Sequence, residues 1–179
     1  MDEQSALREA VTREPQVTVL GEDRFVVTPD VLDRVEVATE TFEIKCATGH
    51  TYSAAWTGPR VSSLLELAGV DPETTHVVIE SADEYRVAVP VRDALGGILA
   101  FVKDGATIAD DQEYLNRLVC PGTEGARDIK GASKIEPVTL APGEDPESLE
   151  NLFPEGERFT ADREMDDPDA HWEPDPPSA

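Results

Sequence analysis

The residue of this chain with the most distinctive chemistry is Cys46, one of only two cysteines. It ends a strand-like run that begins at Phe42 and opens a loop that contains Gly49, and Trp56 follows ten residues after it. A thiolate displayed at a strand end is a suitable ligand for a soft metal centre. The alternative is a buried, unreactive thiol, which is what most lone cysteines are. A single cysteine does not decide between these two roles.

The elements that must position Cys46 are mostly strands. Runs of β-branched and other apolar residues predict strands at 17–20, 24–27, 35–37, 76–80, 86–90, 98–102, 115–119 and 133–140. Apolar spacing predicts a helix over 61–68 that ends at Gly69, and a helical turn at 91–95. The pair Asp104-Gly105 predicts a hairpin. This order predicts an α+β fold that is mostly β, with few short helices.

A length of 179 residues predicts one domain with a tail. We expect residues 1–16 to form an N-terminal arm, as a short helix or as frayed chain, and residues 17–140 to form the domain. Residues 141–179 hold 13 acidic residues, two basic residues and many prolines. Because such a segment buries too little apolar surface to offset chain entropy, we expect it to be extended or partly disordered.

The net charge of −23, from 38 acidic and 15 basic residues, restricts the choice of partners. Excess carboxylate repels nucleic acid and anionic membranes, so neither is an expected partner. Acidic, lysine-poor chains resemble proteins of salt-accumulating halophiles; the alternative is an ordinary acidic protein with a disordered tail. No apolar run approaches the roughly 20 residues of a membrane span. The first residues show no export signal, which predicts a soluble, cytoplasmic protein.

Four segments between residues 40 and 140 occur in an order that one family shares. They are Cys46 with Trp56–Arg60 and Leu64–Gly69, then His76–Ser81 with Tyr85, then Ile98–Gly105, and then Arg117–Gly122 with Gly125–Lys130. Together they resemble the molybdopterin-dependent oxidoreductases of the sulfite oxidase type. The resemblance implies the molybdopterin-binding fold of that family and a cofactor of molybdopterin with molybdenum.

The resemblance also implies roles for single residues. Cys46 would give molybdenum its one protein thiolate, beside two dithiolene sulfurs of the pterin and terminal oxygens. The positions that would contact the cofactor, including the stretch that wraps its terminal phosphate, are Ser81, Gln112, Arg117, Asp128, Ile129 and Lys130. Lysine and backbone N–H groups suit a phosphate. Arg117 could instead pair with surface carboxylates.

On the substrate side, the candidates beside Cys46 are His50 and Arg60. His50 could face the metal or be merely exposed, and Arg60 could bind an anionic substrate or pack against acidic neighbours. Two departures from the family pattern stand out. Little chain precedes Cys46, and Asp128 puts a carboxylate where the phosphate is expected.

The sequence favours a mononuclear molybdenum oxidoreductase that transfers an oxygen atom to or from a small S-oxide, N-oxide or sulfite-like oxyanion. Whether the chain is an enzyme stays uncertain at this point. Since the chain has no haem or iron–sulfur motif, electrons would pass to a separate electron-transfer partner. One alternative is a degenerate, cofactor-free relative that serves as a binding or assembly module. Another is a plain acidic scaffold with Cys46 in its core.

Overall fold

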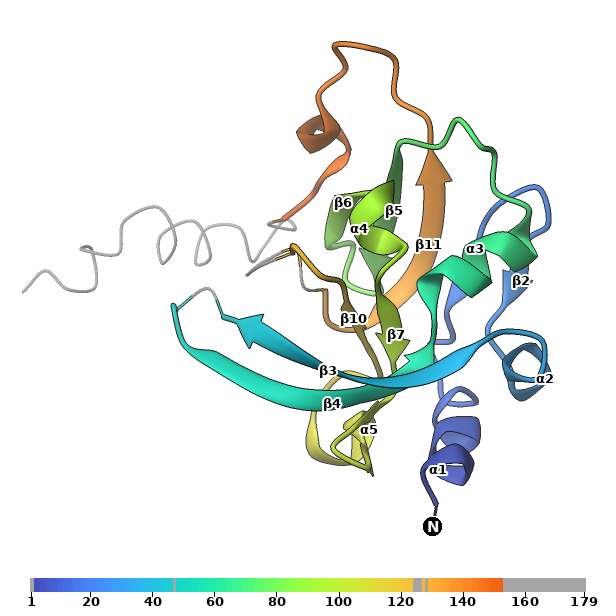
Figure 1. The fold of residues 1–179 in the computed structure, drawn as a ribbon, viewed down its shortest axis with the longest axis vertical. Helices are drawn as coiled ribbons and strands as arrows, with labels where there is room; N and C mark the ends of the chain where they lie inside the picture. Colours follow the sequence, from blue (N-terminus) through green and yellow to red (C-terminus); the bar gives the residue numbers. More distant parts are fainter. Residues whose placement is uncertain (1, 47, 124–126, 128, 153–179) are drawn as a thin grey trace, which may run out of the picture.

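The computed structural model describes residues 2–46, 48–123, 127 and 129–152 (Figure 1). The prediction of a mostly-β fold with few short helices is confirmed. The elements are α1 (Glu3–Ala10), β1 (Thr18–Val19), β2 (Phe25–Val26), α2 (Pro29–Leu32), β3 (Val37–Lys45), β4 (Thr51–Pro59), α3 (Val61–Ala68), β5 (His76–Ser81), β6 (Arg86–Pro90), α4 (Val91–Ala94), β7 (Ile98–Ala100), β8 (Val102–Lys103), β9 (Ala106–Thr107), α5 (Ile108–Asp111), β10 (Arg117–Val119), β11 (Ala132–Val138) and the 3-10 helix η2 (Pro146–Leu149).

The strands of the described residues form three sheets. The largest has the order β2-β1-β11-β5-β6, the second pairs β10 with β7, and the third has the order β3-β4-β8-β9. Only β1 and β11 pair in parallel among these neighbours; the other pairs in the described sheets are antiparallel. Antiparallel neighbours fit the short connections between successive strands.

The main core lies between the largest sheet and the short helices, and α1 is part of it. Ala6, Leu7 and Ala10 of α1 are buried in the same cluster as Leu64 of α3 and Ile135 of β11. The sequence allows either a short helix or frayed chain in residues 1–16, and residues 3–10 form a helix. Asp2 caps this helix, because its side chain accepts the N–H of Ser5 at 2.8 Å. Its burial in the core makes α1 a structural element of the domain.

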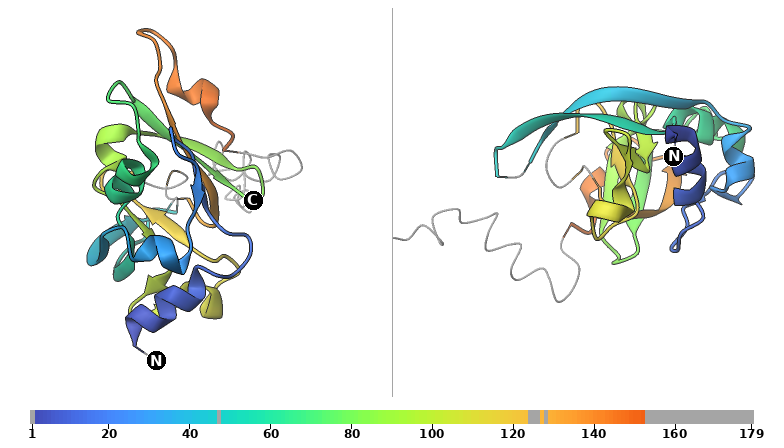
Figure 2. Two further views of the ribbon diagram at one scale, coloured as in Figure 1. Left: turned by 90° about the vertical axis from the view of Figure 1, so that its right-hand side faces the viewer. Right: turned by 90° about the horizontal axis from the view of Figure 1, so that it is seen from below.

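A long hairpin of β3 and β4 crosses one side of the molecule. Its register runs through nine residue pairs, from Val37 opposite Pro59 to Lys45 opposite Thr51. Figures 1 and 2 show that the end of the hairpin near Lys45 projects beyond the body. The hairpin crosses β7 closely at Gly58, where a Cβ atom would lie 1.9 Å from the carbonyl oxygen of Leu99. Only glycine allows this approach.

The predicted helix over 61–68 is present with the same bounds as α3, and Gly69 follows it in the left-handed conformation (φ 70°). The predicted hairpin at Asp104 is also present, since Asp104 and Gly105 both have positive φ and join β8 to β9. None of the helices in the described ranges is long and apolar enough to cross a membrane.

Residues 144–152, which we call the strap, run along the outer edge of β6. Asn151 and Arg86 exchange two backbone hydrogen bonds, each of 2.8 Å. Leu152 packs against the main core. The first part of the acidic segment therefore packs against β6 and the main core. Residues 153–179 lie outside the described residues.

Candidate functional site

The hairpin has an inner face that packs against β7 and β10. Successive side chains of a strand point to opposite faces, so Ile44, Ala54 and Trp56 share this face. They form a second, smaller core cluster with Ile98, Ala100, Ile108 and Val119. This cluster fixes the hairpin against the body.

Cys46 lies at the projecting end of the hairpin. Its N–H donates to the carbonyl of His50 at 2.8 Å, and the N–H of Gly49 donates to the carbonyl of Cys46 at 2.8 Å. Gly49 has φ 85°, a conformation that suits glycine in so tight a turn. The thiol side chain is half-buried and His50 is exposed. Cys46 directly follows the last residue of β3, close to the strand end that the sequence predicts, and the turn leads into β4 at Thr51.

Arg117 of β10 is buried and lies against the inner face of the hairpin. Its Nη1 donates to the hydroxyl of Tyr52 at 3.1 Å, and its guanidinium carbon lies 5.7 Å from the centroid of the Trp56 ring. Tyr52 lies two residues beyond His50 on β4, a step of about 7 Å along a strand. The guanidinium therefore lies on the side of the hairpin that leads to Cys46.

Lys130 lies beside Arg117, because residue 130 forms a bridge with residue 117 across the backbone. Directly opposed residues of an antiparallel pair point to the same face. The Nζ of Lys130 lies 5.7 Å from the centroid of the Tyr114 ring. Ile129 points the other way, into the main core, and its carbonyl accepts the N–H of Leu118 at 3.0 Å. Asp128 lies outside the described residues.

Lys103 of β8 is a third cation on the inner face, and the sequence motifs did not indicate it. It pairs with Trp56 across the strands, and its Nζ lies 4.8 Å from the Tyr52 centroid and 5.6 Å from that of Trp56. Neither Lys103 nor Lys130 forms a salt bridge with a carboxylate of the described residues; both face aromatic rings. In a chain with 38 acidic residues, that environment is unusual for lysine.

Ser81 and Gln112 flank the same region. Ser81, at the end of β5, is 6% exposed, pairs with Ala132, and its hydroxyl accepts the N–H of Asp83 at 3.2 Å. Ala82 and Asp83 share a small cavity with Tyr114 and Lys130. Gln112 is exposed just after α5, two residues before Tyr114.

Arg60 lies at the opposite end of the hairpin from Cys46. The nine residue pairs separate them by more than about 25 Å. Its Nη2 donates to Glu40 at 2.5 Å and its Nε donates to Glu36 at 2.7 Å. Hydrogen bonds to Glu40 and then to Glu36 raise the pKa of Arg60. The structure therefore brings Arg117 and Lys130 together, but it does not bring Arg60 to the thiol.

The residues on the inner face match the needs of an anionic cofactor that carries a soft metal. Cys46 offers a soft sulfur ligand, and Arg117, Lys130 and Lys103 offer positive charge. The indole Nε1 of Trp56 is buried and has no hydrogen-bond partner among the described residues. A buried donor left unsatisfied costs about 1–3 kcal/mol. These observations fit the group that the sequence resemblance implies.

Known proteins resemble this chain in sequence and in fold. A family model described as the oxidoreductase molybdopterin binding domain matches residues 16–143. Mitochondrial sulfite oxidase of Drosophila melanogaster is 34% identical over 98 residues, which cover 49% of this chain and 17% of that protein. The crystal structure of the sulfane dehydrogenase SoxCD from Paracoccus pantotrophus matches with a TM-score of 0.62 and 23% identity, over 80% of this chain and 41% of that chain.

The chain therefore belongs to the family of oxidoreductase molybdopterin-binding domains. Its fold is of the sulfite oxidase type, which confirms the fold that the sequence predicted. It spans less than half the length of either protein that it resembles. Helix α1 and the whole strap lie outside the matched residues 16–143.

Proposed function

We propose that the chain binds molybdopterin with molybdenum and transfers an oxygen atom to or from a small S-oxide, N-oxide or sulfite-like substrate. In this proposal Cys46 is the protein ligand of the metal. When bound, the cofactor would supply the redox metal centre that gives an oxygen atom to the substrate or takes one from it. The residues of the chain bind and orient the cofactor and the substrate.

One observation carries the proposal: Arg117 and Lys130 stand side by side on the face of the hairpin that ends at Cys46. Two adjacent cations could bind the terminal phosphate of the cofactor. We assign Ser81, Gln112 and the backbone of Ile129 to the same site, because Ser81 pairs with Ala132, two residues after Lys130, and Gln112 lies two residues before Tyr114. Asp128 is retained as a cofactor-side position from the family resemblance alone.

Lys103 and His50 are our candidates for the substrate side. The ammonium group of Lys103 lies over the Tyr52 ring, on the side of the hairpin that leads to Cys46. An anionic substrate that approaches Cys46 would meet this positive charge. His50 is exposed in that turn, and its ring stacks on Tyr52 with centroids 6.5 Å apart. An imidazole beside the thiol could hold or release a proton during oxygen transfer. Arg60 is left with its two carboxylates and has no part in this proposal.

We also propose that electrons reach the site from a separate partner protein. With only two cysteines in the sequence, this chain cannot itself bind an iron–sulfur cluster through four cysteines. The expected cytoplasmic location and the halophilic source remain predictions.

Metal and pterin analysis tests the proposal. The full chain is produced in a host grown with ample molybdate, purified, and analysed for molybdenum and for pterin. We expect close to one equivalent of each. Less than about a tenth of an equivalent, in protein that shows the native circular dichroism and a cooperative unfolding transition, would contradict the proposal. That result would favour the cofactor-free binding or assembly module.

Turnover of defined substrates tests the second half of the proposal. Metal-loaded protein is offered a sulfoxide, an N-oxide and sulfite, each with a suitable artificial electron donor or acceptor. We expect oxygen transfer with at least one of them. Loaded protein that turns over none of the three would limit the proposal to cofactor binding.

A further inference from the structure

The strap contains an acidic side chain, Glu150, that is buried although most acidic side chains lie in solvent. Its side chain is only 5% exposed. One oxygen accepts the Nη2 of Arg127 at 2.5 Å, and the other accepts its Nε at 3.2 Å and the backbone N–H of Ala88 at 3.1 Å. A buried carboxylate needs such partners, because desolvation otherwise penalises its charge.

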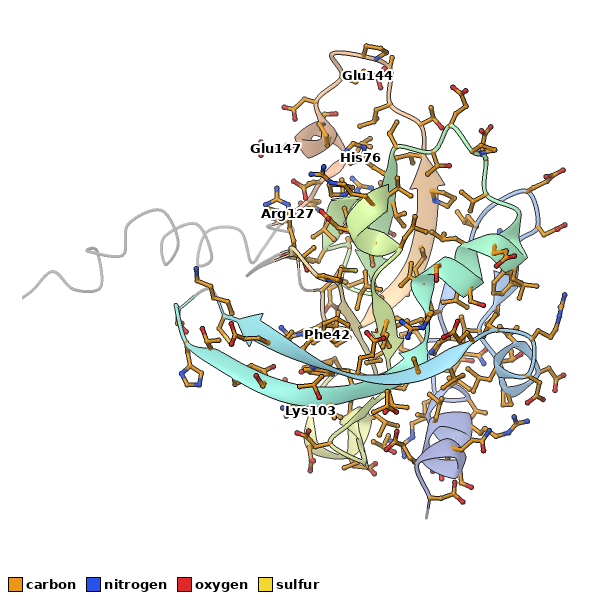
Figure 3. All side chains as sticks on the ribbon, in the orientation of Figure 1. Phe42, His76, Lys103, Arg127, Glu144 and Glu147 are labelled. Atoms are coloured by element: carbon orange, nitrogen blue, oxygen red, sulfur yellow. The ribbon has the colours of Figure 1, made fainter. Side chains whose placement is uncertain are left out.

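The surroundings of Glu150 confirm that this is a protected environment. Tyr85 packs against the main core next to it. Burial and then the charge of Glu150 raise the pKa of Tyr85 to about 12. Glu147 lies farther from Arg127, at 3.8 Å, and is 75% exposed. Figure 3 shows Arg127 and Glu147 on the same side of the molecule, near β6.

Arg127 precedes Lys130 by three residues, so the pair with Glu150 holds one end of the segment that carries Lys130. The other end is held by Asn116. The N–H of Gly131 donates to the carbonyl of Asn116 at 2.7 Å, and the side chain of Asn116 makes two further hydrogen bonds with the backbone of Ala132. Lys130 thus lies between two anchors, one of which comes from the strap.

We infer that Glu150 is a positioning residue: through Arg127, it fixes the segment that presents Lys130 next to Arg117. The inference rests on the proposed function, in which Lys130 and Arg117 bind the phosphate of the cofactor. Glu150 lies outside the residues 16–143 that match the family model, so the matched family domain does not include this contact. The strap would then serve the site as well as cover the edge of β6.

Amide hydrogen exchange of the full chain, followed by NMR, tests the inference without cofactor. The variant is Glu150→Gln, which keeps the shape of the side chain and removes its charge. The N–H of Leu118 reports on the segment because it donates to Ile129. We expect its exchange to become about tenfold faster, and we expect the same for Arg127→Gln. The control Glu147→Gln should leave it unchanged.

A double variant shows whether Glu150 and Arg127 act as one pair or affect the segment independently. If Glu150 acts through Arg127, Glu150→Gln with Arg127→Gln should speed the exchange of Leu118 no more than either change alone. If Glu150→Gln alters exchange only at Ala88 and Asn151, and Leu118 exchanges as in the wild type, the strap merely covers the sheet edge and the inference is wrong. Should Glu150→Gln fail to fold, Arg127→Lys serves the same comparison.

Cofactor retention gives the second readout. Purified wild type and Glu150→Gln are dialysed in parallel, and molybdenum and pterin are measured over time. We expect the variant to lose molybdenum and pterin about tenfold faster than the wild type. Residues that hold a ligand-binding residue in place typically have effects of this size. Equal loss rates would overturn the inference. Wild type that never holds cofactor would instead contradict the proposed function, and the exchange of Leu118 alone would then decide whether Glu150 positions the segment.

Discussion

Lys103 is the residue whose environment most directly suggests a contact with an anion. Its ammonium lies over the rings of Tyr52 and Trp56 and forms no salt bridge with a described carboxylate. Cation–π contacts contribute about 0.5–1 kcal/mol each at exposed sites. They hold the charge in place without neutralising it, which leaves it available to a ligand.

We therefore expect Lys103→Met to weaken the binding of an anionic substrate. KM should rise about tenfold with little change in kcat, since the lost attraction acts on substrate and transition state alike. Steady-state kinetics of the metal-loaded protein provide the measurement. Lys134→Met is the matched control, because Lys134 already pairs with Glu80 and Glu136. Equal effects of the two changes would show that general charge, and not the position of Lys103, matters.

Among single residues of the candidate site, some positions can be predicted from the sequence and others cannot. Cys46 could be placed at a strand end from the pattern before it. The adjacency of Arg117 and Lys130 could not, because the two lie 13 residues apart and no sequence pattern predicts the backbone bridge that pairs them. Lys103 lies within the segment Ile98–Gly105, but the pattern of that segment predicts a strand and a hairpin and gives Lys103 no role in a site.

At the scale of elements, β4 is a nine-residue strand that the sequence did not predict, and of the strand expected at 35–37 only Val37 lies in β3. Its residues include Ala54, Ala55 and Gly58, which have low strand propensity, so the local pattern after Cys46 predicts a loop. The pairing with β3 and the burial of Trp56 override that local preference. Helix α3, by contrast, has apolar spacing and a glycine cap, and both its ends could be predicted.

Helix α1 contacts the hairpin of β3 and β4 through hydrogen bonds to the carboxylate of Glu3. Glu3 accepts the hydroxyl of Thr39 at 2.6 Å and that of Thr57 at 2.5 Å. These hydrogen bonds, first from Thr39 and then from Thr57, lower the pKa of Glu3 below 4.5. Because the pKa is lowered in the folded state, the ionised group stabilises the fold fully above pH 4.5. The stabilisation is lost as the pH falls through the folded-state pKa.

We expect Glu3→Gln to lower the free energy of unfolding by about 1 kcal/mol near neutral pH. The difference between wild type and variant should shrink as the pH falls below about 4.5, since the wild-type carboxylate then becomes protonated. Urea unfolding at several pH values measures this difference directly. A difference that stays constant over the whole pH range would show that the charge of Glu3 does not contribute.

At the scale of the whole molecule, charge dominates. With a net charge of −23 on 179 residues, like charges repel across the compact state. Salt shortens the range of this repulsion from about 10 Å at 0.1 M to about 3 Å at 1 M. The described ion pairs, such as Arg8 with Asp33, are mostly exposed and contribute little each. The balance predicts a domain that is more stable in concentrated salt.

We expect the melting temperature to rise by several degrees between about 0.1 M and 2 M KCl, because salt screens the repulsion between the carboxylates. Thermal unfolding followed by circular dichroism measures it. Sucrose at matched water activity is the control, since it favours compact states without screening charge. A melting temperature that does not change with KCl, or that rises equally with sucrose, would contradict the electrostatic explanation.

The coordination of Cys46 to molybdenum is the central claim, and X-ray absorption at the molybdenum edge tests it most directly. Wild type and Cys46→Ser, both loaded and both shown to be folded, are compared. Because Cys46 is half-buried in a turn at the end of the hairpin, the substitution should leave the fold intact. We predict that the variant shows one metal–sulfur bond fewer than the wild type and has lost oxygen transfer. An unchanged sulfur count in the variant would contradict the claim.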